Sequence, residues 1–86
     1  RQRAVRNEIR QRLKLLTPRE RDVIERVVIG KPNKVIATDL DLHQKTVEVH
    51  RAHAMQKLQA GNLADLIRLW LLAHSSDDGD DEPASK

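Results

Sequence analysis

The stretch NKVIATDLDLHQKTVEVHRAHAMQKL, residues 33–58, organises the rest of this chain. Its first part predicts a short helix over residues 34–40, with Asn33 as the N-cap. Residues 41–43 are too few for anything but a turn. A longer helix is then expected over residues 44–58, and its apolar or small stripe consists of Val47, Ala54 and Leu58. A short helix, a three-residue turn and a longer helix together predict a helix-turn-helix.

Two small features of this stretch agree with that prediction. Ala37 lies where the second helix crosses the first, and a small side chain there permits close approach of the two backbones. Asp41 occupies the turn, where the chain needs φ > 0, and Asp tolerates that conformation better than most residues. The side of the second helix opposite the apolar stripe is polar and basic, with Lys45, Glu48, Arg51, Ala52, Gln56 and Lys57.

Composition excludes several classes of protein. A length of 86 residues, 38% of them hydrophobic and only Trp70 aromatic, suits one small domain with an aliphatic core. The absence of cysteine excludes disulfides, thiolate metal sites and a cysteine nucleophile. No apolar run approaches the roughly 18–20 residues of a membrane span, and no secretory signal is present. Because the chain begins with Arg1 rather than Met, we expect it to be part of a longer protein.

Charge is distributed unevenly along the chain. Residues 75–86 contain five acidic residues and one lysine, a net charge of −4, so that residues 1–74 carry +7 when the whole chain carries +3. This excess of positive charge suits a polyanion, although a merely solvated basic surface would look the same on charge alone. The acidic end has almost no apolar content, which predicts a disordered tail.

Residues 1–16 predict a basic helix. Val5, Ile9, Leu13 and Leu16 fall on one stripe, and six basic residues against one glutamate give the segment a charge of +5. Because the apolar stripe needs a partner, we expect a linker helix that packs on the domain. Half of a short coiled coil and a basic arm on DNA stay open as alternatives. A helix on a membrane surface is weakly supported, because the stripe contains no aromatic residue.

The sequence TPRE, which begins at Thr17, is the clearest local signal in the chain. Thr17 is the predicted N-cap, Pro18 suits the first helical position, and Glu20 completes a capping box. We expect this helix to continue to about Ile29, where Gly30 stops it.

The last predicted helix, residues 63–73 with Asn62 as its N-cap, is apolar almost all round. One stripe would serve the core of the domain, so the surplus predicts a second buried surface. A second copy of the chain is the occupant that we expect, and a missing domain is the alternative. The expected dimerisation residues are Leu63, Leu66, Ile67, Trp70 and Leu71.

Several motifs together resemble the DNA-binding domain of the LuxR superfamily, in particular the FixJ/NarL type found at the C-terminus of two-component response regulators. The resemblance runs from Leu16 to about Leu72. It rests on TPRER at residues 17–21, PNK at residues 32–34, the pairs Ile36-Ala37 and Asp39-Leu40, and KTVEVHR at residues 45–51. The chain departs from the family pattern at His43, where Ser or Thr usually caps the recognition helix.

The resemblance implies an all-α fold, a four-helix bundle of the LuxR helix-turn-helix type preceded by a linker helix. Residues 1–16 would be the linker helix from a missing N-terminal receiver domain, residues 17–74 the DNA-binding domain, and residues 75–86 the acidic tail. The third helix of the bundle would enter the major groove of double-stranded DNA, and the fourth would form a two-fold homodimer. The resemblance therefore implies a transcription regulator that acts on the bacterial chromosome in the cytoplasm.

The same resemblance assigns contacts to individual residues. Glu48 would accept from the amino group of a cytosine, and Val49 and Ala52 would pack on a thymine methyl group. Arg51 would form a fork onto guanine or a phosphate. The expected phosphate contacts are Asn33, Lys34, Lys45, Thr46 and Lys57.

Other chemistry is poorly supported. Val47 and His50 are expected to point inward, with His50 hydrogen-bonding near the interface of the two motif helices. His50 and His53 are three residues apart, but no third ligand lies near them, so we expect no metal. The serines lie in the acidic end and no Gly-rich phosphate loop is present. We therefore expect neither a cofactor nor an enzyme.

Two other functions stay open. The chain could be a helical protein-interaction module whose basic face meets an acidic partner. It could also be the effector domain of a quorum-sensing LuxR-type regulator, whose sensor domain binds an acyl-homoserine lactone. The residues at positions 39–42 and 46–51 favour the response-regulator branch.

Overall fold

The computed structural model describes residues 1–75, and in this range the chain forms helices and no strands. The helices are α1 (Gln2–Leu13), α2 (Pro18–Val28), α3 (Asn33–Leu40), α4 (Gln44–Leu58) and α5 (Leu63–Ala73). The predicted all-α fold with a helix before the bundle is therefore confirmed. The predicted acidic tail, apart from Ser75, lies outside the described residues.

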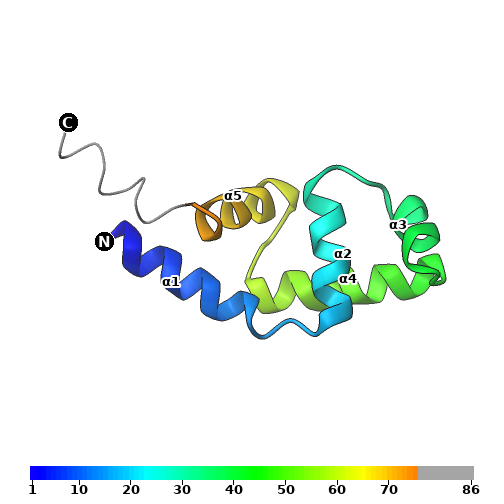
Figure 1. The fold of residues 1–86 in the computed structure, drawn as a ribbon, viewed down its shortest axis with the longest axis horizontal. Coiled ribbons are helices and arrows are strands. Elements are labelled where there is room, and N and C mark those ends of the chain that lie inside the picture. Colours follow the sequence, from blue (N-terminus) through cyan, green and yellow to red (C-terminus); the bar gives the residue numbers. More distant parts are fainter. Residues whose placement is uncertain (76–86) are drawn as a thin grey trace.

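The long helix α4 is the centre of the molecule (Figure 1). Helices α2 and α3 pack against it, α1 touches its C-terminal part, and α1 lies beside α5 at the end of the molecule away from α3. Six of the core residues have no exposed surface at all, namely Val23, Ile24, Ile36, Val47, Ala54 and Leu66. The core is aliphatic, as the composition predicted.

Helix α2 begins at the predicted capping box. The hydroxyl of Thr17 accepts a hydrogen bond from the backbone N–H of Glu20 at 3.1 Å, and the Glu20 carboxylate accepts one from the backbone N–H of Thr17 at 2.9 Å. The helix ends at Val28, one residue before the expected end. Gly30 follows with φ = 96°, a conformation that favours glycine.

The turn between α3 and α4 has the predicted left-handed residue. Asp41 has φ = 57°, and the N–H of Leu42 donates to the carbonyl of Ala37 at 2.9 Å, which closes the end of α3 in a Schellman motif. The expectation that Asn33 caps α3 is wrong. Asn33 is already the first helical residue, so the N-cap is Pro32. The side chain of Pro32 has no group that could accept a hydrogen bond.

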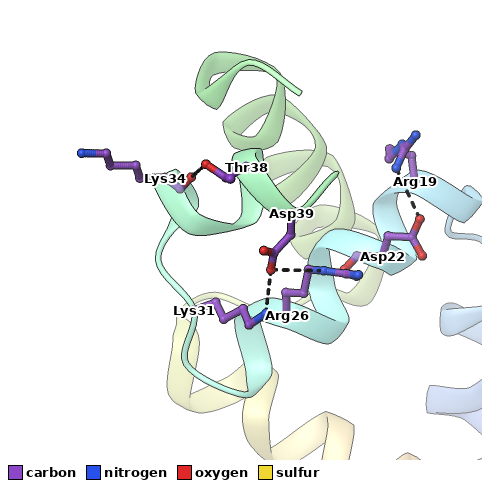
Figure 2. A network of polar contacts seen from close by, with 7 residues as sticks. All are labelled: Arg19, Asp22, Arg26, Lys31, Lys34, Thr38 and Asp39. Atoms are coloured by element: carbon purple, nitrogen blue, oxygen red, sulfur yellow. Dashed lines mark hydrogen bonds and ion pairs between the residues drawn. The ribbon is translucent and has the colours of Figure 1, made fainter. Parts of the chain in front are cut away.

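Helix α3 is fastened to α2 by an ion-pair network (Figure 2). The carboxylate of Asp39 lies 2.6 Å from the Lys31 ammonium and 3.8 Å from the Arg26 guanidinium. Arg26 also donates to the backbone carbonyl of Asp22. The network joins the end of α2, the following loop and α3, which sets the position of the first helix of the motif.

Helix α1 packs on α5, as the linker-helix prediction required, but with a different stripe. Ile9 and Leu13 are buried, whereas Val5 is 45% exposed and Arg6 is only 1% exposed. The guanidinium of Arg10 donates to the carbonyls of Ala73 at 2.7 Å and Ser75 at 2.9 Å. These carbonyls end α5, where the helix lacks its own donors and a positive charge is favourable. A rule that places only apolar residues inside does not predict the burial of Arg6.

The start of α5 and the end of α4 are closed by local hydrogen bonds. The side chain of Asn62 accepts from the N–H of Asp65 at 2.8 Å, which confirms the predicted cap of α5. Helix α4 ends at Leu58, its C-cap Gln59 has φ = 58°, and the N–H of Ala60 donates to the carbonyl of Met55. The left-handed residue is thus Gln59 and not the nearby Gly61.

Candidate nucleic-acid interface

One face of α4 is open along the length of the helix. Val47, Ala54 and Leu58 enter the core with at most 1% of their surface exposed, as the apolar stripe predicted. The opposite face is exposed and carries Lys45, Glu48, Val49, Ala52, His53 and Gln56. Three of the four expected base-contact residues, Glu48, Val49 and Ala52, lie on this face.

The N-terminal part of this face is charged and accessible. The side chain of Lys45 is 87% exposed and that of Glu48 is 47% exposed, and their charged atoms are 4.0 Å apart. An ion pair this exposed and this long contributes little to stability, so both side chains can turn toward a partner. Thr46 is half-buried and lines an open hollow with Asp41, Leu42 and His43.

Arg51 lies at the edge of the open face and not at its centre. It is half-buried, and its guanidinium donates to the side-chain oxygen of Asn33 at 3.1 Å. The bond joins α4 to the first turn of α3, where Lys34 is exposed. The structure therefore brings together two residues that we assigned to bases and phosphates separately. Pattern-based prediction missed this bond because its partners are 18 residues apart in the chain.

Lys57, expected to be a phosphate contact, is half-buried and bonds to polar groups of its own chain. Its ammonium donates to the Glu20 carboxylate at 2.7 Å and to the backbone carbonyl of Leu15 at 3.1 Å. His53 lies 3.9 Å from the other oxygen of the same carboxylate. The stripe rule had placed Lys57 on the outer face, but its side chain turns toward the start of α2.

Glu20 is the only acidic residue in the part of the chain that the structure describes whose side chain is buried, with 4% of the residue exposed. Burial by itself raises the pKa of Glu20. The hydrogen bond from Lys57, the backbone N–H of Thr17 and the charges of Lys57 and His53 outweigh that effect and leave the pKa below its ordinary value of 4.5. The carboxylate is therefore ionised at neutral pH and ties α4 to the start of α2.

His50 is half-buried, between the open face and the core. Within residues 1–75 its side chain makes no hydrogen bond, so the bond that we expected from it is absent. The described residues also contain no group of three or more histidine, cysteine, aspartate or glutamate side chains that could hold a metal ion. None of the described helices is both long enough and apolar enough to cross a membrane.

Helix α5 has a second, open apolar stripe away from the core. Leu63, Ile67 and Leu71 are 44%, 36% and 65% exposed. Leu66 has no exposed surface, so its assignment to a dimer surface is wrong: it belongs to the core of its own chain. Trp70 is half-buried and stacks on His74, with ring centres 4.3 Å apart.

A short helix, a left-handed turn and a longer helix with an open polar face define a helix-turn-helix of the DNA-binding class. The motif is held by α2 on one side and closed by α1 and α5 at the far end (Figure 1). The chain belongs to the luxR family of bacterial regulatory proteins, whose family model matches residues 14–70. That family consists of DNA-binding transcription regulators and is not a class of enzymes.

Individual relatives of the chain are also regulatory proteins. The chain is 54% identical over 65 residues to the transcriptional regulatory protein FixJ of Rhizobium meliloti, covering 76% of this chain and 32% of that protein. It is 51% identical over 53 residues to the tetrathionate response regulatory protein TtrR of Salmonella typhimurium, covering 62% of this chain and 26% of that protein.

Solved structures are similar as well. Full-length FixJ from B. japonicum superposes with a TM-score of 0.79 at 43% identity, covering 84% of this chain and 36% of that one. The response regulator StyR gives a TM-score of 0.76 at 38% identity, with 79% and 34% covered. The chain therefore spans about a third of the length of FixJ and StyR.

Proposed function

We propose that this chain is the DNA-binding effector domain of a two-component response regulator and that it recognises a specific duplex sequence. The observation that carries the proposal is the open face of α4, which presents Glu48, Val49 and Ala52 side by side on a helix long enough to enter a major groove. An α-helix fits the major groove of B-DNA, and only that groove distinguishes all four base pairs. The relatives named as response regulators support this branch of the family over the quorum-sensing branch.

Three side chains carry the base recognition in this proposal. Glu48 accepts a hydrogen bond from the amino group of a cytosine, and Val49 and Ala52 pack on a thymine methyl group. Arg51 has a different role from these three residues. Its bond to Asn33 directs the guanidinium along the edge of α4, where it reaches a guanine or a phosphate beside the helix.

The phosphate contacts in this proposal come from both helices of the motif. Lys45 is almost fully exposed at the start of α4, and Lys34 is exposed in the first turn of α3. Thr46 and the backbone N–H groups of Asn33 and Lys34 complete the set. Lys57 is not included, because Glu20 holds its ammonium.

The proposal includes two partners besides DNA. The open stripe of Leu63, Ile67 and Leu71 on α5 binds the same stripe of a second copy, so that two recognition helices address a palindromic site. Helix α1 connects the domain to a receiver domain. This assignment is supported by the short share of FixJ that the chain spans. A regulator of this kind works on the chromosome in the bacterial cytoplasm.

Selection of this chain against a random duplex pool tests the proposed function, followed by titration of the enriched duplex at two salt concentrations. We expect an enriched palindrome with half-sites about one helical turn apart. The enriched duplex should bind at least about 10³-fold more tightly than random duplex at equal salt. No binding even at low salt would contradict DNA binding. Binding without enrichment would contradict sequence recognition and would favour a basic surface that meets any polyanion.

A further inference from the structure

Lys57 and His53 meet at the buried carboxylate of Glu20. They are four residues apart, so they lie on the same side of α4, and both approach Glu20 in the first turn of α2. Arg51 is two positions before His53, so about 200° of helical rotation separates them. Arg51 bonds to α3 on its own side. Polar contacts of Arg51 and Lys57 therefore hold α4 on both sides of its open face.

Lys57 has the charge, exposure and position of a phosphate contact, but its ammonium is bonded to Glu20. Its side chain is 34% exposed and it lies in the last turn of α4, beside the open face. A free lysine in this place would reach a phosphate of any duplex, whatever its base sequence. Lys45 at the other end of α4 differs from it: the Lys45 side chain is 87% exposed and its nearest carboxylate oxygen lies 4.0 Å away.

We propose that Glu20 determines the specificity of DNA binding by withholding Lys57 from the phosphates. The carboxylate removes one contact that all sequences would share, so a larger part of the affinity comes from Glu48, Val49 and Ala52 at the bases. Specificity is the difference between two affinities, and a lower affinity for wrong sequences increases it. This inference rests on the proposed function and adds to it a residue that touches no DNA.

A double-mutant cycle tests this inference. The salt dependence of binding to random duplex is measured for wild type, Glu20→Gln, Lys57→Gln and the double variant, together with the ratio of specific to random affinity. Each phosphate contact steepens the slope of log K against log salt by about 0.9. We expect Lys57→Gln to leave the slope unchanged. Glu20→Gln should steepen the slope by about 0.9 and lower the specificity ratio several-fold, and the double variant should return to the wild-type slope.

If the charges of Glu20 and Lys57 acted independently, the four salt slopes would differ from those that we expect. If Lys57 acted only through its charge, Lys57→Gln would flatten the slope by the same amount whether or not the chain also carried Glu20→Gln. That outcome would overturn the inference, as would an unchanged slope for Glu20→Gln. The result for Lys57→Gln is decisive even if Glu20→Gln does not fold, because a flatter slope means that Lys57 already contacts phosphate.

A control distinguishes failure of this inference from failure of the proposed function. Lys45→Gln should flatten the slope by about one phosphate contact, because the exposed Lys45 is free to bind DNA. If Lys45→Gln behaves so while the cycle shows no coupling, the proposed function stands and the role of Glu20 is wrong. If wild type does not bind duplex, both are overturned. Circular dichroism of each variant reports whether the fold is retained.

Discussion

Glu20 has two structural roles at the scale of a single residue. Its carboxylate accepts the Thr17 N–H that starts α2, and it accepts the Lys57 ammonium that orients the end of α4. One buried charge therefore joins a local capping motif to a contact across 37 residues of chain. The charge is tolerated inside the protein because one oxygen accepts hydrogen bonds from Thr17 and Lys57 and the other faces the His53 ring at 3.9 Å.

Glu20 should make stability dependent on pH. Its pKa is lowered in the folded state, so its stabilisation is complete above the ordinary value of 4.5 and is lost as the pH falls through the folded-state pKa. We expect Glu20→Gln to lower the free energy of unfolding by about 2 kcal/mol near neutral pH. The difference from wild type should shrink toward zero in acid. Urea denaturation at a series of pH values measures both quantities.

Glu25 provides a matched control on the same helix. Its carboxylate is exposed and pairs with Arg21 at 3.3 Å on the surface, so Glu25→Gln should change the unfolding free energy by less than about 0.5 kcal/mol. A Glu20→Gln variant that loses the same stability at every pH would contradict the electrostatic explanation and would indicate a packing effect.

Local signals at single residues were predictable, and long-range ones were not. The cap at Thr17 and the left-handed turn at Asp41 depend on neighbours within four residues, so the sequence pattern contains them. The partners of Asn33, Lys57 and Arg10 lie 18 to 65 residues away. No periodicity encodes such pairs, so the bonds from Arg51 to Asn33 and from Lys57 to Glu20 were not predicted.

At the scale of the element, α1 behaves as a part of the domain. Its apolar residues enter the same core as those of α5, and its arginines satisfy the carbonyls that end α5 and α4. The family model begins only at residue 14, after α1 has ended. Helix α1 is therefore packed on the domain although it lies outside the matched residues.

A pair of substitutions in α1 tests this packing. Ile9 is 3% exposed and Val5 is 45% exposed, although the sequence stripe placed both inside. We expect Ile9→Ala to lower the free energy of unfolding by about 2–4 kcal/mol through the cavity it leaves. Val5→Ala should lower it by less than about 0.5 kcal/mol. Thermal or urea denaturation measures both, and equal effects would contradict the docked position of α1.

The bounds of the elements were largely predictable because caps and stops are local. The start of α2 and the full length of α5 agree with the sequence, and α4 was expected over its observed range. The stripe of α1 was partly wrong. Arg6 takes the place that the periodicity gave to Val5, because its long side chain also reaches the hydroxyl of Ser75. Amphipathic side chains can enter a core in this way, and a binary pattern does not distinguish them.

At the scale of the whole molecule, the two proposed interfaces belong to different elements. Helix α3 lies at one end of the molecule, and α5 lies with α1 at the other (Figure 1). In the proposed function, DNA and a second copy therefore bind to different helices.

Leu71 on α5 tests the proposed dimer. It is 65% exposed, so Leu71→Glu should leave the melting temperature close to that of wild type. We expect the variant to lose the two-to-one complex with a palindrome and to bind it about 10²-fold more weakly, since two linked half-sites no longer act together. Sedimentation with and without duplex measures this. An unchanged two-to-one complex would contradict the role of α5. Leu66 is unsuitable for this test, because it is buried and Leu66→Ala would disturb the core.

In the proposed function the open face of α4 contacts the bases. Selection with variants of that face tests this contact most directly. The random-pool selection is run in parallel on wild type, Glu48→Ala and Lys45→Gln. We expect Glu48→Ala to relax the enriched motif at one base pair in each half-site, with a loss of about 1–3 kcal/mol of discrimination there. Lys45→Gln should weaken all sequences alike and keep the motif. An identical motif for wild type and Glu48→Ala would contradict base recognition by this face of α4.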